Sequence, residues 1–365
     1  EVYEDEEPIG PTYISMHPQQ DSLSFISPLA YYDYQDNLIK ATDVKYIDVA
    51  DARIYPDEGN VVVEQDARIR PLENARVKAN MLTKHHLFHS ANINIYSRKS
   101  YDGLGNYDFE DEYGKIQNIH FKQIEVDENL QTIASGEIFE PDDFRLSPYY
   151  SYIGKVFLEA DEKFLTFDGA VKIEHSCDKI TPRWLDFRSE INPYNIYIPV
   201  PEQPLDINKS KIYAGLFMYY DSVHIYPAFL THRKNYSDRN IIPVSGYLFY
   251  DKATQLYKIS SMEKLLIRET PGNYLSLHRA ECELYGEGKL DLGVDLGLVQ
   301  LQTAGNLRHH ISENATKFDL FLGIDFFFEE KILDICNAVQ SNVYYSGTGA
   351  RHYQKEENFS IRGIE

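Results

Sequence analysis

Hard oxygen ligands gather in residues 100–115, SYDGLGNYDFEDEYGK. Calcium sites take six to eight oxygen ligands from carboxylates, amides and backbone carbonyls. The candidate ligands are Asp102, Asp108, Glu110 and Asp111, with Asn106 and Glu112 beside them. The spacing of these residues differs from that of an EF-hand loop and from that of nonapeptide calcium repeats. A solvent-exposed turn that tolerates substitution would show the same pattern of acids. Calcium is therefore the one cofactor that the sequence suggests, and a solvated turn is the alternative.

Histidines form a second cluster, because KHHLFHSAN places His85, His86 and His89 close together. Two of them could share a metal with a distant carboxylate, although the spacing fits no standard zinc motif. A surface histidine cluster is the other interpretation. His309 and His310 follow AGNLR, where we expect a turn between two long strands.

Catalytic motifs do not appear in the sequence. Paired carboxylates can perform glycoside hydrolysis, but 57 acidic residues make some pairs inevitable. A P-loop, a nucleophile elbow, HExxH and a Cys-His arrangement are all missing from their expected contexts. Cys177, Cys282 and Cys336 are too far apart for a CxxC motif, so at most one disulfide forms within the chain. The single tryptophan, Trp184, is expected to anchor a core and not to bind a sugar.

Composition limits the partners. The formal charge of -21 repels phosphate backbones and anionic lipid headgroups, which disfavours nucleic-acid binding. Apolar runs never reach the roughly 18 residues of a membrane-spanning helix. The 29 Tyr and 19 Phe residues favour strands with one buried face. The sequence begins at Glu1 without an apolar leader, so we expect a processed product or a piece of a larger protein.

The predicted fold class is mainly β, with an irregular segment at 1–40 and repetitive strands at 41–190. The repeats are ADARI, QDARI, ENARV and ANINI, with small residues Ala52, Ala67, Ala75 and Ala91. Ala52 and Ala75 are 23 residues apart, and Ala67 and Ala91 are 24 apart. This spacing suits the coils of a parallel β-helix. The alternative is a sandwich-like antiparallel arrangement in which these segments are similar strands.

A proline-rich connector leads to an antiparallel part at 205–345, followed by a tail at 346–365. YLFYDKATQLYKIS predicts a hairpin with its turn near DKATQ. Short helices are expected at 260–269, with Ser261 as N-cap, and at 329–341. Strict alternation at 290–298 and 318–328 predicts two long strands that pair antiparallel and bury a shared apolar face. The helix at 329–341 would cover that face.

Several segments of the chain resemble very long, uncharacterised, β-rich envelope proteins of Bacteroidota. These segments are VADARIYPDEG, FLTFDGAVKIEHSC, NPYNIYIP, SGYLFYDK and YGEGKLDLGVDLG. The resemblance implies an extracytoplasmic location in the periplasm, outer membrane or cell surface. It also implies that other segments of the parent chain, or envelope proteins, are the partners. The alternating C-terminal strands are similar to the apolar grooves of AsmA-like lipid-transfer proteins.

These features predict a non-catalytic structural or interaction module of a larger cell-envelope or secreted protein. The alternatives are a carbohydrate-active enzyme or glycan-binding module on a β-helix, and a lipid-transfer groove.

Overall fold

The computed structural model describes residues 7–220, 224–293 and 299–326. The chain is mainly β, which confirms the predicted fold class, and it divides into two compact units. The first unit contains the chain up to residue 175 together with 182–199 and 204–211, and the second contains 176–181, 200–203 and the chain from 212 onward. Among the described residues, the helices are too short or too polar to cross a membrane.

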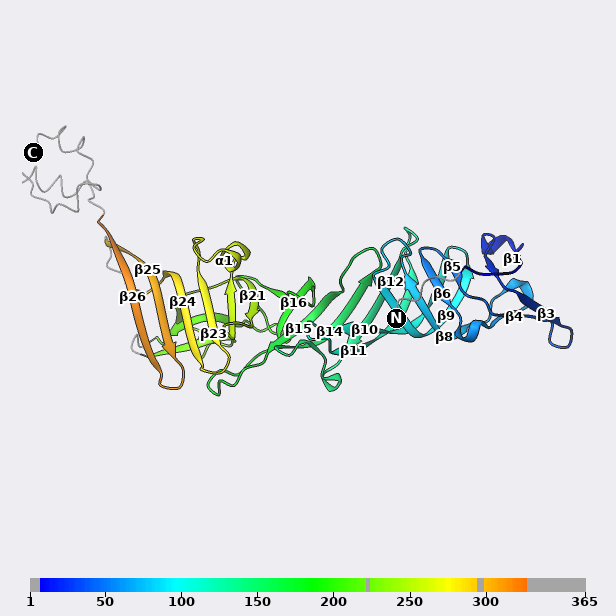
Figure 1. Cartoon of the computed structure of the whole chain (residues 1–365). Helices are drawn as coiled ribbons and strands as arrows, with labels where there is room; N and C mark the ends of the chain where they lie inside the picture. Colours follow the sequence, from blue (N-terminus) through cyan, green and yellow to red (C-terminus); the bar gives the residue numbers. More distant parts are fainter. Residues whose placement is uncertain (1–6, 221–223, 294–298, 327–365) are drawn as a thin grey trace, which may run out of the picture. The chain divides into compact units, whose positions relative to one another are not determined.

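The first unit is built on one curled antiparallel sheet, coloured from blue through cyan to green in Figure 1. Its strands follow the order β16-β15-β14-β12-β11-β10-β9-β8-β6-β5, and β13 pairs with β14. The bounds are β5 (Ile47–Val49), β6 (Ala52–Tyr55), β8 (Leu72–Ala79), β9 (His86–Ser97), β10 (Ser100–Glu110), β11 (Ile116–Val126), β12 (Thr132–Ile138), β13 (Arg145–Ser147), β14 (Tyr150–Glu159), β15 (Thr166–Ile173) and β16 (Leu185–Glu190).

The repeated segments lie in neighbouring antiparallel strands. The Ala52 segment forms β6 and the Ala75 segment forms β8, and these two strands pair directly. Ala67 instead lies in the 3-10 turn η3 (Gln65–Ala67), with φ of 59°. Each pairing described for this unit is antiparallel, whereas a β-helix stacks parallel coils. The β-helical interpretation of 41–190, which the repeat spacing favoured, is therefore incorrect. The pairing is antiparallel, as in the alternative, and the strands belong to one curled sheet.

Aromatic side chains fill the inner face of this curled sheet. Phe88 and Phe121 meet edge to face with ring centroids 5.5 Å apart, and Tyr152 packs on Phe167 in the same way at 4.9 Å. All four side chains are buried. Offset and edge-to-face contacts of this kind add to the free energy of burying the rings. The many Tyr and Phe residues of the sequence thus form a packed core in this unit.

Short strands precede the main sheet where the sequence suggested an irregular segment at 1–40. β1 (Thr12–Ile14) pairs with β2 (Ser24–Ile26), and β3 (Leu29–Asp33), β4 (Leu38–Thr42) and β7 (Val61–Val63) form a three-stranded sheet. The expectation of irregular structure is incorrect for these strands. Three further 3-10 turns in this unit are η1 (Pro18–Gln20), η2 (Asp57–Gly59) and η4 (Glu140–Asp142).

The second unit carries a sheet in which β21 to β26 are neighbours in sequence order, drawn from yellow-green to orange in Figure 1. Its strands are β21 (Gly246–Asp251), β22 (Leu256–Ser260), β23 (Tyr274–His278), β24 (Glu283–Leu290), β25 (Val299–His310) and β26 (Ala315–Phe326). A smaller sheet joins β18 (Tyr213–Met218), β19 (Ile225–Thr231) and β20 (Arg239–Asn240), and β17 (Tyr197–Val200) lies where the chain passes between the units.

Two local predictions in the second unit are confirmed. β21 and β22 form the expected hairpin around residues 252–255. The helix α1 (Met262–Leu266) begins after Ser261, whose hydroxyl accepts a hydrogen bond from the backbone N–H of Lys264 at 3.3 Å. The N-cap hydroxyl satisfies a donor that has no partner within the helix. This helix is shorter than the predicted 260–269.

The C-terminal strand pair differs from the prediction. β26 contains most of the second predicted strand, but its antiparallel partner is β25 (residues 299–310) and not 290–298. Leu290 ends β24, whereas residues 294–298 and the predicted helix at 329–341 lie outside the described residues. Leu322 and Ile324 share a face with the buried Leu307, yet they are 60% and 44% exposed. The apolar face of β26 is therefore only partly buried.

Candidate functional site

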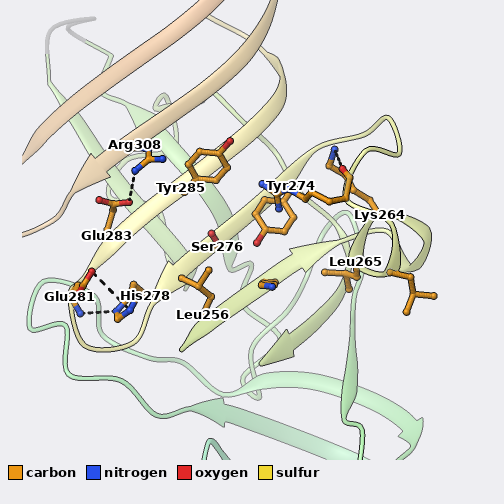
Figure 2. Close-up of a pocket in the computed structure, with 13 residues that line it drawn as sticks. Leu256, Lys264, Leu265, Tyr274, Ser276, His278, Glu281, Glu283, Tyr285 and Arg308 are labelled. Atoms are coloured by element: carbon orange, nitrogen blue, oxygen red, sulfur yellow. Dashed lines mark hydrogen bonds and ion pairs between the residues drawn. The ribbon is translucent and has the colours of Figure 1, made fainter. Parts of the chain in front are cut away.

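A groove of about 440 Å³ lies on the polar face of the second unit's sheet, beside α1 (Figure 2). Strand pairing places Lys258, Ser276, Tyr285 and Arg308 directly opposite one another on four successive strands. Paired residues of neighbouring strands point to the same face, so this row forms the floor of the groove. The remaining lining residues are Leu256, Lys264, Leu265, Leu266, Arg268, Tyr274, His278, Glu281 and Glu283.

Glu287 organises one end of the groove. Its carboxylate contacts Lys264 Nζ at 2.8 Å, Arg268 at 2.8 Å and the Tyr285 hydroxyl, which donates to it at 3.0 Å. The side chain of Lys264 is only 5% exposed, and its ammonium also donates to the carbonyl of Thr270. These hydrogen bonds and charges hold the pKa of Glu287 below its usual value despite partial burial. The carboxylate is therefore ionised at neutral pH and fixed in position.

Two guanidinium groups lie over the aromatic side chains of the groove. Arg268 sits 3.3 Å from the ring centroid of Tyr274, a cation–π contact. Arg268 and Arg308 each lie 5.5 Å from the ring centroid of Tyr285. Burial and the bond to Glu287 raise the pKa of the Tyr285 phenol, which keeps it protonated. The ring and the guanidinium planes form flat surfaces along the row.

The opposite end of the groove is formed by the turn between β23 and β24. His278 Nδ1 accepts hydrogen bonds from the backbone N–H groups of Ala280 and Glu281, at 3.3 and 2.9 Å. Because Nδ1 accepts, the ring proton is assigned to Nε2, which faces the Glu281 carboxylate at 4.0 Å. Ser276 is 2% exposed and its hydroxyl lies at the floor. This end thus presents one ring N–H, one hydroxyl and an exposed carboxylate.

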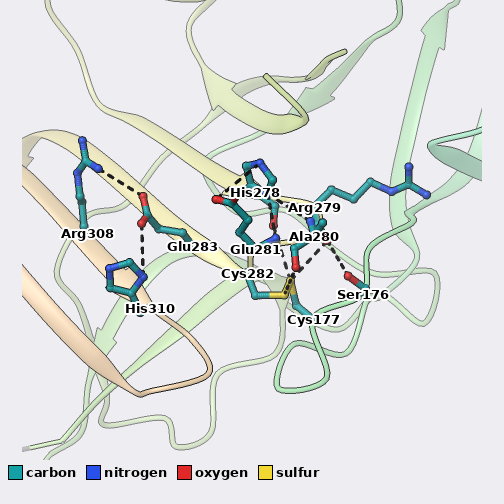
Figure 3. A network of polar contacts seen from close by, with 10 residues as sticks. All are labelled: Ser176, Cys177, His278, Arg279, Ala280, Glu281, Cys282, Glu283, Arg308 and His310. Atoms are coloured by element: carbon teal, nitrogen blue, oxygen red, sulfur yellow. Dashed lines mark hydrogen bonds and ion pairs between the residues drawn. A yellow bond between two sulfur atoms is a disulfide. The ribbon is translucent and has the colours of Figure 1, made fainter. Parts of the chain in front are cut away.

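Glu283 and a disulfide hold this turn in place (Figure 3). The Glu283 carboxylate lies 3.7 Å from Arg308 and 3.4 Å from His310 on the neighbouring strand. Cys282 forms a disulfide with Cys177, whereas the sequence alone left open which cysteines pair. The hydroxyl of Ser176 donates to the carbonyl of Arg279 at 3.1 Å. A segment about a hundred residues upstream therefore fixes the turn that carries His278 and Glu281.

The predicted acidic turn is a strand. Asp102 and Asp108 lie in β10, where Asp102 accepts hydrogen bonds from Asn94 and Tyr96, and Asp108 pairs with His89 at 3.1 Å. Glu110 ends the strand, and Asp111 is buried and caps the following turn through the N–H groups of Tyr113 and Lys115. The expectation of a loop is incorrect, because β10 pairs on both edges. The expected exposure holds for Asp108 and Glu110.

The described residues contain no group of three or more His, Cys, Asp or Glu side chains arranged to hold a metal ion. The calcium site stays a prediction from the sequence.

The histidines of the predicted cluster lie in different environments. His86 is buried, and its Nε2 lies 2.8 Å from the carbonyl oxygen of Glu162. His89 lies on the surface beside Asp108.

His309 and His310 end β25, next to the turn where the sequence placed them. His309 is fully buried, with Nδ1 2.8 Å from the hydroxyl of Thr316. Its Nε2 has no hydrogen-bond partner in the described part of the chain. Burial, assisted by nearby His310 and Lys179, lowers the pKa of His309 to about 4.

The groove was not predicted from the sequence. The sequence feature that indicates this face is the alternation in YLSLH (274–278) and ELYGE (283–287). The alternation places Tyr274, Ser276 and His278 on one face of the sheet. Alternation shows that one face is polar, but the cross-strand register that aligns Ser276 with Tyr285 and Arg308 is a tertiary property.

Comparison with known proteins gives one partial similarity. Residues 299–365 match the WbqC-like protein family, and this stretch includes β25, β26 and therefore Arg308 of the groove. The match covers less than half of the chain, so it describes this stretch and not the whole protein. Neither the curated proteins nor the solved structures that were searched contain a match.

Proposed function

We propose that this chain is a non-catalytic binding module of a larger extracytoplasmic protein, with the groove across β22 to β25 as its binding surface. The observation that carries the proposal is the in-register row of Lys258, Ser276, Tyr285 and Arg308 on four strands. Side chains on adjacent strands of a sheet are more rigidly placed than side chains on loops. The row is thus a preorganised surface on which a ligand contacts several groups at once.

Glu287, at one end of the groove, is suited to holding its neighbours in place and not to acid catalysis. A general acid needs a pKa near the working pH, which burial or a like charge raises for a carboxyl group. The pKa of Glu287 is lowered, and its oxygens are occupied by Lys264, Arg268 and Tyr285. Glu287 therefore acts as a fixed counter-ion that positions its neighbours.

The disulfide between Cys177 and Cys282 supports the extracytoplasmic location. Disulfides form and persist in oxidising compartments and are rare in the reducing cytosol. The lipid-transfer alternative concerns the apolar face of the C-terminal strands. The observation in its favour is the exposure of Leu322 and Ile324 on β26, at 60% and 44%.

A ligand screen with a blocked groove tests the proposal. Saturation-transfer NMR is recorded with pooled saccharides, peptides, amino acids and nucleosides on the unmodified chain and on Ser276→Tyr, which fills the groove. Ser312→Tyr, in the exposed turn after β25, is the matched control. Arg308→Tyr is a second blocking variant that folds readily, since the Arg308 side chain is 58% exposed.

The proposal predicts at least one ligand whose saturation-transfer signal is lost in both blocking variants and persists in the control. After long incubation with the protein, this ligand should be recovered chemically unchanged. Two results contradict it. One is that no ligand distinguishes the blocking variants from the control, and the other is a ligand that the protein converts chemically through the groove.

A further inference from the structure

We infer that the ligand of the groove is an uncharged saccharide, an inference that rests on the binding function proposed above. The charges of the groove balance. Its four cationic side chains share three carboxylates, in the pairs Lys258–Asp251, Lys264–Glu287, Arg268–Glu287 and Arg308–Glu283. Glu281 at the rim is the fourth acid. Neither an anion nor a strong cation therefore finds an excess of opposite charge in the groove.

The groove presents a mixture of hydrogen-bond donors and acceptors. The Nε2–H of His278 donates, the Glu281 carboxylate accepts, and the Ser276 hydroxyl does both. Glu283 has longer contacts, 3.4 Å to His310 and 3.7 Å to Arg308, which leave acceptor capacity on its oxygens. Hydroxyl groups act as donor and acceptor at once, so a polyol matches such alternating partners better than a ligand with donors or acceptors alone.

The groove also has apolar surface. Tyr285 of β24 supplies an aromatic ring, and Leu256 of β22 and Leu265 of α1 line another part of the groove (Figure 2). A pyranose ring has a face of C–H groups that packs on aromatic and aliphatic side chains while its hydroxyls point outward. The groove volume of about 440 Å³ falls within the roughly 300–1,000 Å³ of small-molecule sites. A short oligosaccharide therefore suits its size and its amphipathic surface.

Titration calorimetry with three matched sets of sugars tests the inference. The sets are neutral hexose oligosaccharides, the corresponding uronic-acid oligosaccharides and the corresponding amino-sugar oligosaccharides, each titrated into the full chain. We expect binding by at least one neutral set, with weaker binding by its acidic and basic counterparts. Ser276→Ala should weaken the affinity about three- to tenfold, the effect of losing a neutral hydrogen bond, and Ser312→Ala should leave it unchanged.

Glu283→Gln separates the ligand classes, because the amide keeps the shape and removes the charge. A neutral sugar should lose little affinity, whereas an amino sugar should lose most of it. The inference is overturned if a charged set binds more tightly than its neutral counterpart, or if peptides or nucleosides occupy the groove and sugars do not; the proposed binding function then stands. If the blocked and control variants of the ligand screen behave alike with every ligand, the proposed function itself fails.

Discussion

Cys177 and Cys282 are joined by a disulfide across 105 residues of sequence, with Cα atoms 5.4 Å apart, and both lie in the second unit. Closing a loop of this length restricts the unfolded chain, which stabilises the folded state by about 2–5 kcal/mol. We predict that Cys177→Ser with Cys282→Ser lowers the free energy of unfolding of the second unit by this amount. Urea denaturation measures it. Equal denaturation midpoints for the oxidised protein and the double variant would show that the bridge does not stabilise the unit.

Glu287 neutralises Lys264, whose side chain is almost fully buried. Glu287→Gln keeps the size of the side chain but leaves the ammonium without its counter-ion, so we expect a loss of about 1–3 kcal/mol in the free energy of unfolding. Asp186→Asn is the control, because the Asp186–Lys209 pair is exposed and should change stability by less than about 0.5 kcal/mol. Similar losses in the two variants would mean that Glu287 is an ordinary surface acid.

The buried His309 should make the second unit sensitive to acid. Its pKa is lowered from 6.5 to about 4, so the unfolded state binds more protons between these values. The contribution of neutral His309 to the free energy of unfolding is fully present above pH 6.5. It falls by about 2–3 kcal/mol as the pH decreases towards 4. Burial also lowers the pKa of His86 in the first unit, which contributes in the same direction.

Thermal or urea unfolding of His309→Leu at pH 7 and pH 5 checks this dependence. The variant should lose less stability between the two pH values than the unmodified chain. His224→Gln, at an exposed position of the second unit away from His309, should keep the original pH dependence. If all three proteins lose stability in parallel, the dependence does not originate at His309.

Gly103 allows two strands to approach closely. A Cβ atom at this position would lie 2.1 Å from the backbone oxygen of Asn92, so Gly103→Ala must move β9 away from β10. We expect a loss of about 2 kcal/mol or more in the free energy of unfolding of the first unit. Gly323→Ala is the control, because its Cβ would meet only ordinary contacts at 3.6 Å. Equal melting temperatures for Gly103→Ala and the unmodified protein would contradict the close approach.

The same glycine explains why the acidic segment was misjudged from the sequence. Gly103 and Gly105, together with acids, indicate a turn when only their neighbours in the chain are considered. In the folded chain they lie in β10, where contacts with Asn92 and Ala91 leave no room for a side chain. Such contacts depend on how distant segments pair. Local composition predicted the β class, the hairpin at 246–260 and the N-cap at Ser261, because each rests on short-range chemistry.

The cross-strand register also explains why the site was not predicted from the sequence. The alternation that predicted long strands also existed in 274–278 and 283–287, but it fixes only which residues share a face. The alignment of Ser276 with Tyr285, and of Tyr285 with Arg308, follows from turns and pairings that the sequence pattern does not specify. For the same reason the partner of β26 was misassigned, although its own period was right.

Hydrogen–deuterium exchange with and without the tightest-binding neutral oligosaccharide tests the central claim most directly, because it locates the ligand along the chain. The account predicts slower exchange in segments 256–258, 274–285 and around Arg308, which are the strands and turn of the groove. Exchange in the first unit's sheet should not change. Protection confined to the first unit, or unchanged exchange throughout at saturating sugar, would contradict a saccharide-binding groove on β22 to β25.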